Sequence, residues 1–188
     1  MAATTSLQMN DDEPAPKLLL LDDEQELDVQ DDDVIYENNI DKTLRVSLQF
    51  DKMMGTYSIR LSKLSTNAEE EEDEKTFFMT ENVTKNFIRA LDKLKPLIRK
   101  YLKSGSKFCY KLELTDNVYV TFGRNTPQYG GSIFIDIRNH FSDEDGHIFP
   151  TKVGIRFNPK YAASLKASLT ECLDKILEEA DNNQVILN

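Results

Sequence analysis

The sequence predicts an α+β fold in which two repeats, each a curved antiparallel sheet followed by one amphipathic helix, pack as an intrachain pseudo-dimer. In each half of the chain, runs that alternate apolar and polar residues, as half-buried strands do, precede a segment whose apolar residues recur every three or four positions, as in a helix. The two halves also align with a shift of 78 residues and no gap, so that Arg60 falls on Arg138 and Phe87 on Leu165. Such an alignment is typical of an internal duplication.

The first 41 residues are predicted to be a disordered acidic tail. They hold 13 acidic residues against one basic residue, Lys17, and almost no aromatic side chains. A segment of this kind cannot bury enough apolar surface to offset the entropy of ordering it. Within the tail, Lys17 to Val29 embeds leucines among acidic residues. That composition fits a disordered activation segment that folds on a partner, and equally a solvated tail with a chance run of leucine.

The first repeat is expected over residues 42–103. Residues 44–50 and 57–61 alternate apolar and polar side chains as strands do, and Met53 to Gly55 offers a turn between them. Two such runs joined by a short turn predict a hairpin.

A helix should complete the first repeat. After an acidic loop at 69–74 and a short strand at 76–79, Thr80 is expected to cap a helix, because its side chain can accept a bond from a free N–H of the first turn. Pro96 should kink this helix or end it early, since proline removes a backbone bond and clashes with the preceding turn. The predicted apolar stripe comprises Phe87, Leu91, Leu94, Ile98 and Leu102.

The second repeat is expected over residues 104–181, with residues 182–188 as a C-terminal tail. Asn158 and Pro159 form an N-cap and first-turn pair that should begin its helix. The predicted strands are 107–114, 118–122, 133–138 and 152–157, and the apolar positions of the helix are Ala162, Leu165, Leu169, Cys172 or Leu173, and Ile176.

An ordered series of short motifs runs through this second repeat: Ile135-Asp136-Ile137-Arg138, His140-Phe141, the acidic turn 143–146, Pro150, Lys152, Gly154-Ile155 and Asn158-Pro159. In order and spacing, from about Tyr119 to Ile176, the series resembles the DNA-binding domain of the transcriptional coactivator positive cofactor four family. The resemblance implies a nuclear single-stranded DNA-binding protein that acts in transcription, as a coactivator does, or in the handling of melted DNA. It also implies transcription proteins as partners of the acidic tail.

By position, the resemblance marks Arg124, Arg138, Phe141 and Lys152 as nucleic-acid-contacting residues. Basic and aromatic residues interleave on the same predicted sheet, where bases can stack on rings while cations follow the phosphates. This pattern adds Lys111 and Arg156 as candidates, and the first repeat offers Arg45, Lys52, Arg60 and Lys63.

The sequence also departs from the resembled family. Ser132 stands where the family has a further cation, and Phe149 and Val153 stand where it is usually basic. The family's N-terminal region is rich in serine, whereas Ser6 is the only serine before Ser47 here. These differences predict weaker binding, or binding shared with the first repeat.

A net charge of −10 argues at first against a nucleic-acid ligand, because phosphate binding needs a positive surface. The acids are concentrated in the tail and the 69–74 loop, however. Residues 85–111 hold nine Lys or Arg against Asp92 alone. The charge distribution therefore permits a basic surface on an acidic chain.

The sequence offers no catalytic site. It has no phosphate-binding glycine loop and no nucleophile beside an evident base, so we expect no enzyme and no cofactor. His140 and His147 are expected to be polar loop residues, and no metal is expected. The turn at Asp143 to Gly146 lacks the ligands of a calcium loop, because Lys152 stands where the bidentate glutamate should be.

Two cysteines, Cys109 and Cys172, are expected to be free thiols. No apolar run is long enough for a membrane span, which favours a soluble intracellular protein.

Two other functions fit the same residues. A tandem sheet-plus-helix protein of the Pur-alpha type would prefer purine-rich single strands of DNA or RNA. An acidic protein-interaction factor whose DNA surface has decayed would bind neither DNA nor RNA. If the two helices pack together, the chain should be a monomer, with a homodimer formed elsewhere as the alternative.

Overall fold

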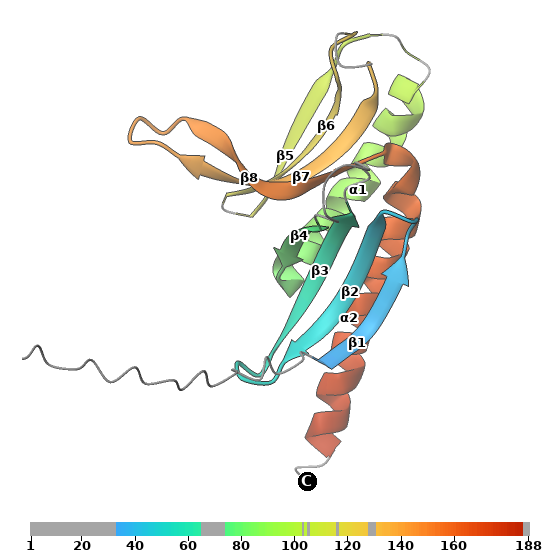
Figure 1. Ribbon diagram of the computed structural model, residues 1–188, viewed down its shortest axis with the longest axis vertical. Coiled ribbons are helices and arrows are strands. Elements are labelled where there is room, and N and C mark those ends of the chain that lie inside the picture. Colours follow the sequence, from blue (N-terminus) through green and yellow to red (C-terminus); the bar gives the residue numbers. More distant parts are fainter. Residues whose placement is uncertain are drawn as a thin grey trace, which may run out of the picture. The chain divides into compact units, whose positions relative to one another are not determined.

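The computed structural model describes two four-stranded antiparallel sheets and two long helices (Figure 1). None of the described helices has the length and apolar character needed to cross a membrane. The described residues are 33–64, 74–102, 104, 106–115, 117–127 and 131–185, with side chains described up to residue 182.

The first sheet is a meander in which each strand pairs with the next along the chain. The sharp turn between its second and third strands contains Gly55 at φ 61°, a conformation that glycine adopts without strain. Helix α1 follows the sheet, and Thr80 caps it by accepting a bond from the N–H of Val83 at 3.3 Å, as predicted. The elements are β1 (Asp33–Asn39), β2 (Leu44–Asp51), β3 (Thr56–Leu64), β4 (Glu74–Met79) and α1 (Glu81–Leu102).

The second sheet repeats this order, which confirms the predicted two-repeat α+β fold. A short 3-10 turn, η2, precedes its helix, and the Asn158 side chain caps that turn by accepting a bond from the N–H of Lys160 at 2.9 Å. The elements are β5 (Cys109–Thr115), β6 (Val118–Arg124), β7 (Ile133–Ser142), β8 (Ile148–Phe157), η2 (Pro159–Tyr161) and α2 (Ala162–Val185).

Strand β1 corrects the predicted boundary of the acidic tail. Residues 33–39 were expected to be disordered, but they pair with β2 and give the first sheet a fourth strand. Ile35 and Tyr36 are half-buried against the core, which offsets part of the cost of ordering an otherwise acidic segment. Residues 1–32 of the predicted tail lie outside the described residues.

Pro96 does not end helix α1, and helix α2 extends further than predicted. Helix α1 continues past the exposed Pro96 to Leu102, so the expectation of an early end was wrong. Helix α2 runs to Val185, into the predicted C-terminal tail. Strands β7 and β8 also extend towards each other beyond the predicted strands, to Ser142 and Ile148.

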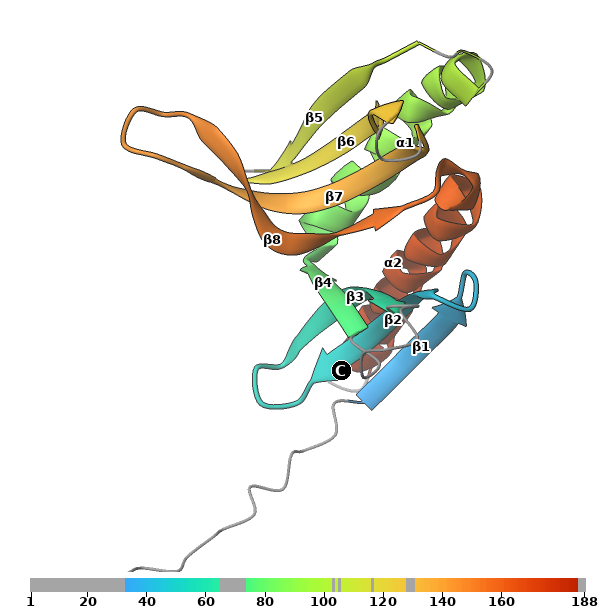
Figure 2. The same cartoon turned by 45° about the horizontal axis from the view of Figure 1, so that its top comes forward.

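Each helix packs on strands of the other repeat. Helix α2 packs on β2 and β3, and α1 packs on β5 and β6 in addition to β3 and β4 (Figure 2). The Asn86 amide on α1 donates to the Leu114 carbonyl on β5 at 2.8 Å. The Asn38 amide on β1 donates to the Ser168 hydroxyl on α2 at 2.7 Å. Each helix therefore helps to cover the sheet of the other repeat, which the sequence did not predict.

The predicted apolar stripes form the centre of this arrangement. Phe87, Leu94, Leu165 and Leu169 are fully buried, and burial of one such side chain contributes about 1.5 to 3 kcal/mol. The helices also contact each other, and Lys166 of α2 pairs with Asp92 of α1 at 2.6 Å. The repeats thus share one core within a single chain, as the pseudo-dimer prediction required.

The two cysteines give a direct test of how α2 docks. Burial in α2 raises the pKa of Cys172 to about 12, whereas Cys109 on β5 is exposed. A thiol reagent attacks an exposed thiolate. In the native protein one thiol should therefore react fast, and the second should react only after unfolding. A Cys109→Ser variant, used as the control, should show no fast thiol. Equal reaction rates of both thiols in the native protein would contradict the docking of α2.

Candidate nucleic-acid interface

A groove lies where the edge strands of the two sheets meet. Strands β4 and β8 are the last strands of their sheets, and they contact each other. The Lys63 ammonium on β3 donates to the Arg156 carbonyl on β8 at 2.7 Å, which ties the two sheets together. The groove has a volume of about 860 Å³ and is lined by residues of β3, β4, β7 and β8.

The groove is strongly basic. Among the described residues that line it, none is acidic and five are cations: Lys63, Lys75, Arg138, Lys152 and Arg156. Two come from the first sheet and three from the second, so neither repeat forms the site alone. Four of the five were predicted from the sequence, and Lys75 was not.

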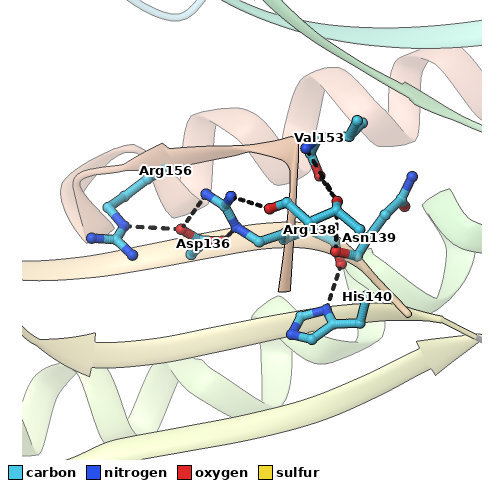
Figure 3. A network of polar contacts seen from close by, with 7 residues as sticks. Asp136, Arg138, Asn139, His140, Val153 and Arg156 are labelled. Carbon is cyan, nitrogen blue, oxygen red and sulfur yellow. Dashed lines mark hydrogen bonds and ion pairs between the residues drawn. The ribbon is translucent and has the colours of Figure 1, made fainter. Parts of the chain in front are cut away.

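A buried carboxylate fixes two of these cations (Figure 3). Asp136 on β7 is 4% exposed and accepts bonds from Arg138 Nε at 2.9 Å and Nη2 at 3.1 Å, and from Arg156 Nε at 2.9 Å. Arg138 also donates to the Thr151 carbonyl at 2.6 Å. One carboxylate faces two guanidinium groups, so this cluster keeps a net positive charge and a defined geometry.

Gly154 allows β8 to lie close to β7 beside this cluster. A Cβ atom at Gly154 would lie 2.6 Å from the Ile137 carbonyl oxygen and 2.8 Å from the Arg138 Cβ. Any larger residue would push β8 away from β7 and change the wall of the groove. The glycine is therefore required by close backbone approach, since its φ is not in the left-handed region.

His140 is buried on β7 next to this cluster, so its expected place in a polar loop was wrong. Its ring lies 4.6 Å from the Tyr119 ring, and its Nδ1 donates to the Arg138 carbonyl at 3.2 Å. Burial lowers the pKa of His140 from its ordinary value; the bond to the Arg138 carbonyl opposes this, and the charges of Lys111 and Arg138 add to the lowering.

The segment that supplies β7 and β8 also carries a family signature. Residues 112–168 match the family model described as Transcriptional Coactivator p15 (PC4). The match confirms the resemblance in this segment. It runs from β5 into α2 and includes Arg138, Lys152 and Arg156 of the groove, but neither Lys63 nor Lys75. A comparison with curated proteins found no match.

Arg124, although inside the PC4-matched segment, does not reach the groove. Its guanidinium donates to the Gly131 carbonyl at 2.9 Å and to the Tyr101 carbonyl at 3.0 Å, and a third bond goes to the Ser104 carbonyl. Tyr101 lies in the last turn of α1, where the carbonyls lack helical partners. These bonds favour a structural role for Arg124.

Two further predicted residues of the PC4-matched segment or its border lie on other parts of the second sheet. The Lys111 ammonium on β5 lies 4.2 Å from the centre of the Tyr119 ring. Phe141 is 52% exposed near the end of β7, and its ring stacks on Phe149 with the ring centres 5.5 Å apart. Phe141 thus offers an apolar surface, as a stacking residue must.

The predicted cations of the first sheet, Lys63 excepted, also lie outside the groove. Arg45 pairs with Glu74 at 2.6 Å and with Glu37 at 3.3 Å. Lys52 pairs with Asp33 at 3.0 Å. These acidic partners offset the charges of Arg45 and Lys52, since each of the three ion pairs brings opposite charges within 3.3 Å. Arg60 differs, since its guanidinium lies 4.9 Å from the centre of the Phe78 ring.

The turn between β7 and β8 brings Asp143, Asp145 and His147 together, with potential ligand atoms within 4.8 Å of one another. The Asp143 carboxylate accepts bonds from the His147 backbone N–H at 2.7 Å and from its Nδ1 at 3.2 Å. Gly146 closes the turn at φ 80°. The Asp143 side chain thus helps to close the turn, as a turn aspartate does.

Proposed function

We propose that the chain binds single-stranded nucleic acid, and DNA in the first place, in the groove between β4 and β8. The observation that carries this proposal is the concentration of five cations, with no acid among the described lining residues, on a chain whose net charge is −10. Phosphate groups are the ligands that such a surface attracts, because each one neutralises a cation and releases its own counterions. The PC4 match supports a role in transcription as a coactivator-like factor of the nucleus.

Aromatic side chains near the groove favour single strands over duplex. The Arg156 guanidinium lies 4.0 Å from the centre of the Phe134 ring on the same sheet. Phe141 adds an exposed ring on β7. Unpaired bases expose faces that stack on such rings, at about 1 to 3 kcal/mol per base, whereas a duplex hides them.

We also propose that one chain is sufficient for binding. In a single-repeat protein an uncovered helix stripe would require a second chain. Here the stripes of α1 and α2 are buried within the chain, and the groove takes cations from both repeats. The functional unit is therefore a monomer with an internal pseudo-dimer.

Removing groove cations should weaken binding through electrostatics. We expect the triple variant Lys63→Gln, Lys75→Gln, Lys152→Gln to bind labelled oligodeoxythymidine less tightly in fluorescence anisotropy. The slope of log affinity against log salt should become less steep by about 2, because each phosphate contact with a single strand contributes about 0.7.

A variant with the same loss of charge elsewhere provides the control. Lys93, Lys95 and Lys100 are exposed on α1, so their replacement by Gln should leave the salt slope nearly unchanged. If both triple variants lose the same affinity and slope, binding depends on the total charge and the groove is not the site.

The acidic tail is proposed to regulate this groove. A polyanion tethered near cations competes with nucleic acid at high effective concentration. Deleting residues 1–31, which leaves β1 intact, should tighten single-strand binding at low salt and change it little at high salt, where charges are screened. Titrations of the full and shortened chains at two salt concentrations test this. Equal affinities at low salt would rule out the competition.

A further inference from the structure

The first sheet carries a second set of polar and aromatic groups on the face that does not hold the core. Alternation along the strands places Ile59 and Phe77 in the core and turns their neighbours to the other face. On that face the strand register puts Arg60 of β3 directly opposite both Ser47 of β2 and Phe78 of β4. We call this face, with Gln49 and Ser58 in the next row, the outer face of the first sheet.

Phe78 is the exposed aromatic residue of the outer face. It is 58% exposed, and the Arg60 guanidinium lies 4.9 Å from the centre of its ring. The strand places it two residues beyond Thr76, which lines the groove. Residues two apart in a strand point to the same side. A nucleic-acid strand that leaves the groove along β4 therefore reaches Phe78 next.

Two polar atoms of the outer face are buried and have no partner among the described residues. Gln49 is 8% exposed, and its Oε1 accepts no hydrogen bond from a described residue. Arg60 Nε is likewise buried and donates to none of them. Buried polar groups in folded proteins are nearly always paired, so this acceptor and this donor point to a ligand that pairs with them when the Gln49 and Arg60 side chains turn outward.

The second sheet shows what the outer face lacks. By the repeat alignment, Arg60 corresponds to Arg138, and Ser58 corresponds to Asp136, the carboxylate that holds Arg138. Among the described residues, Arg60 has no ion pair within 4.0 Å. Glu74, which acts on it electrostatically, is hydrogen-bonded to Arg45 at 2.6 Å. Among the described residues, the Arg60 guanidinium therefore has the Phe78 ring and the nearby charge of Glu74 as its neighbours, and no carboxylate holds it in an ion pair.

We infer that the outer face of the first sheet is a second binding site for single-stranded nucleic acid, continuous with the groove. One base stacks on Phe78, Arg60 donates to the same nucleotide, and Gln49 Oε1 accepts a hydrogen bond from the edge of a neighbouring base. The inference rests on the proposed function and extends it to residues outside the PC4-matched segment.

The Gln49 acceptor can be used by several bases. Cytosine and adenine can donate to it through an exocyclic amino group, and thymine through its N3–H, which is open on the Watson–Crick edge of a single strand. The contact therefore depends on a donor on the edge of the base.

The stacking step is tested by changing the ring at an exposed position. Phe78→Leu keeps an apolar side chain but removes the aromatic face, and we expect it to weaken oligodeoxycytidine binding by about 5- to 150-fold. Phe78→Tyr keeps the ring and should bind as the wild type does. Wild-type affinity in Phe78→Leu would overturn the inference and would leave the exposed ring to a protein partner.

The edge contact is tested by Gln49→Leu, which removes the acceptor at similar volume. The wild type should bind oligodeoxythymidine more tightly than an N3-methylated strand, which has lost the donor, and Gln49→Leu should bring this ratio close to one. An unchanged ratio would overturn the base contact. If the wild type binds neither oligodeoxycytidine nor oligodeoxythymidine, the proposed function itself fails; if it binds them and neither variant matters, only the second site fails.

Discussion

Burial of the two helix stripes is the constraint on which the rest of the structure depends. A four-stranded sheet covered by one helix leaves apolar surface exposed to water. Here α2 covers strands of the first sheet, and α1 reaches the second, so each repeat completes the core of the other. The exchange holds the sheets together, and it brings the edge strands β4 and β8 into contact. The groove is a consequence of how the core is closed.

That closure brings cations of the two sheets close together, and a buried carboxylate offsets part of their repulsion. Asp136, buried at 4% exposure, binds both Arg138 and Arg156, while Lys63 donates to a backbone carbonyl of β8. A buried charge without a partner is costly, so the Asp136 carboxylate depends on these two guanidinium groups, which themselves remain partly exposed. The first sheet has Ser58 in the corresponding place and leaves Arg60 on an aromatic ring instead. The two repeats therefore share a fold and differ in what their faces can bind.

The sequence predicted the elements whose pattern is local and missed those decided by contacts across the chain. The regular alternation around Ile59 and the spacing of Phe87, Leu91 and Leu94 predicted β3 and α1. The sequence did not predict strand β1, because only Ile35 and Tyr36 of this strand are half-buried and acidic residues surround them. Lys75 was not predicted, because only the contact between β4 and β8 places it in the groove. The sequence alone does not tell whether a cation on a strand faces a ligand or donates to backbone carbonyls at a helix end, as Arg124 does.

The central claim is that both repeats build one nucleic-acid surface. The most direct measurement is photo-cross-linking of the full chain to a single strand carrying 4-thiothymidine, followed by mass spectrometry of the peptides. A shared groove predicts cross-linked peptides from β4 and from β8, lost together as salt is raised because the same phosphate contacts hold both. Cross-links confined to residues 112–168, with none on β3 or β4, would contradict the account and assign binding to the second repeat alone.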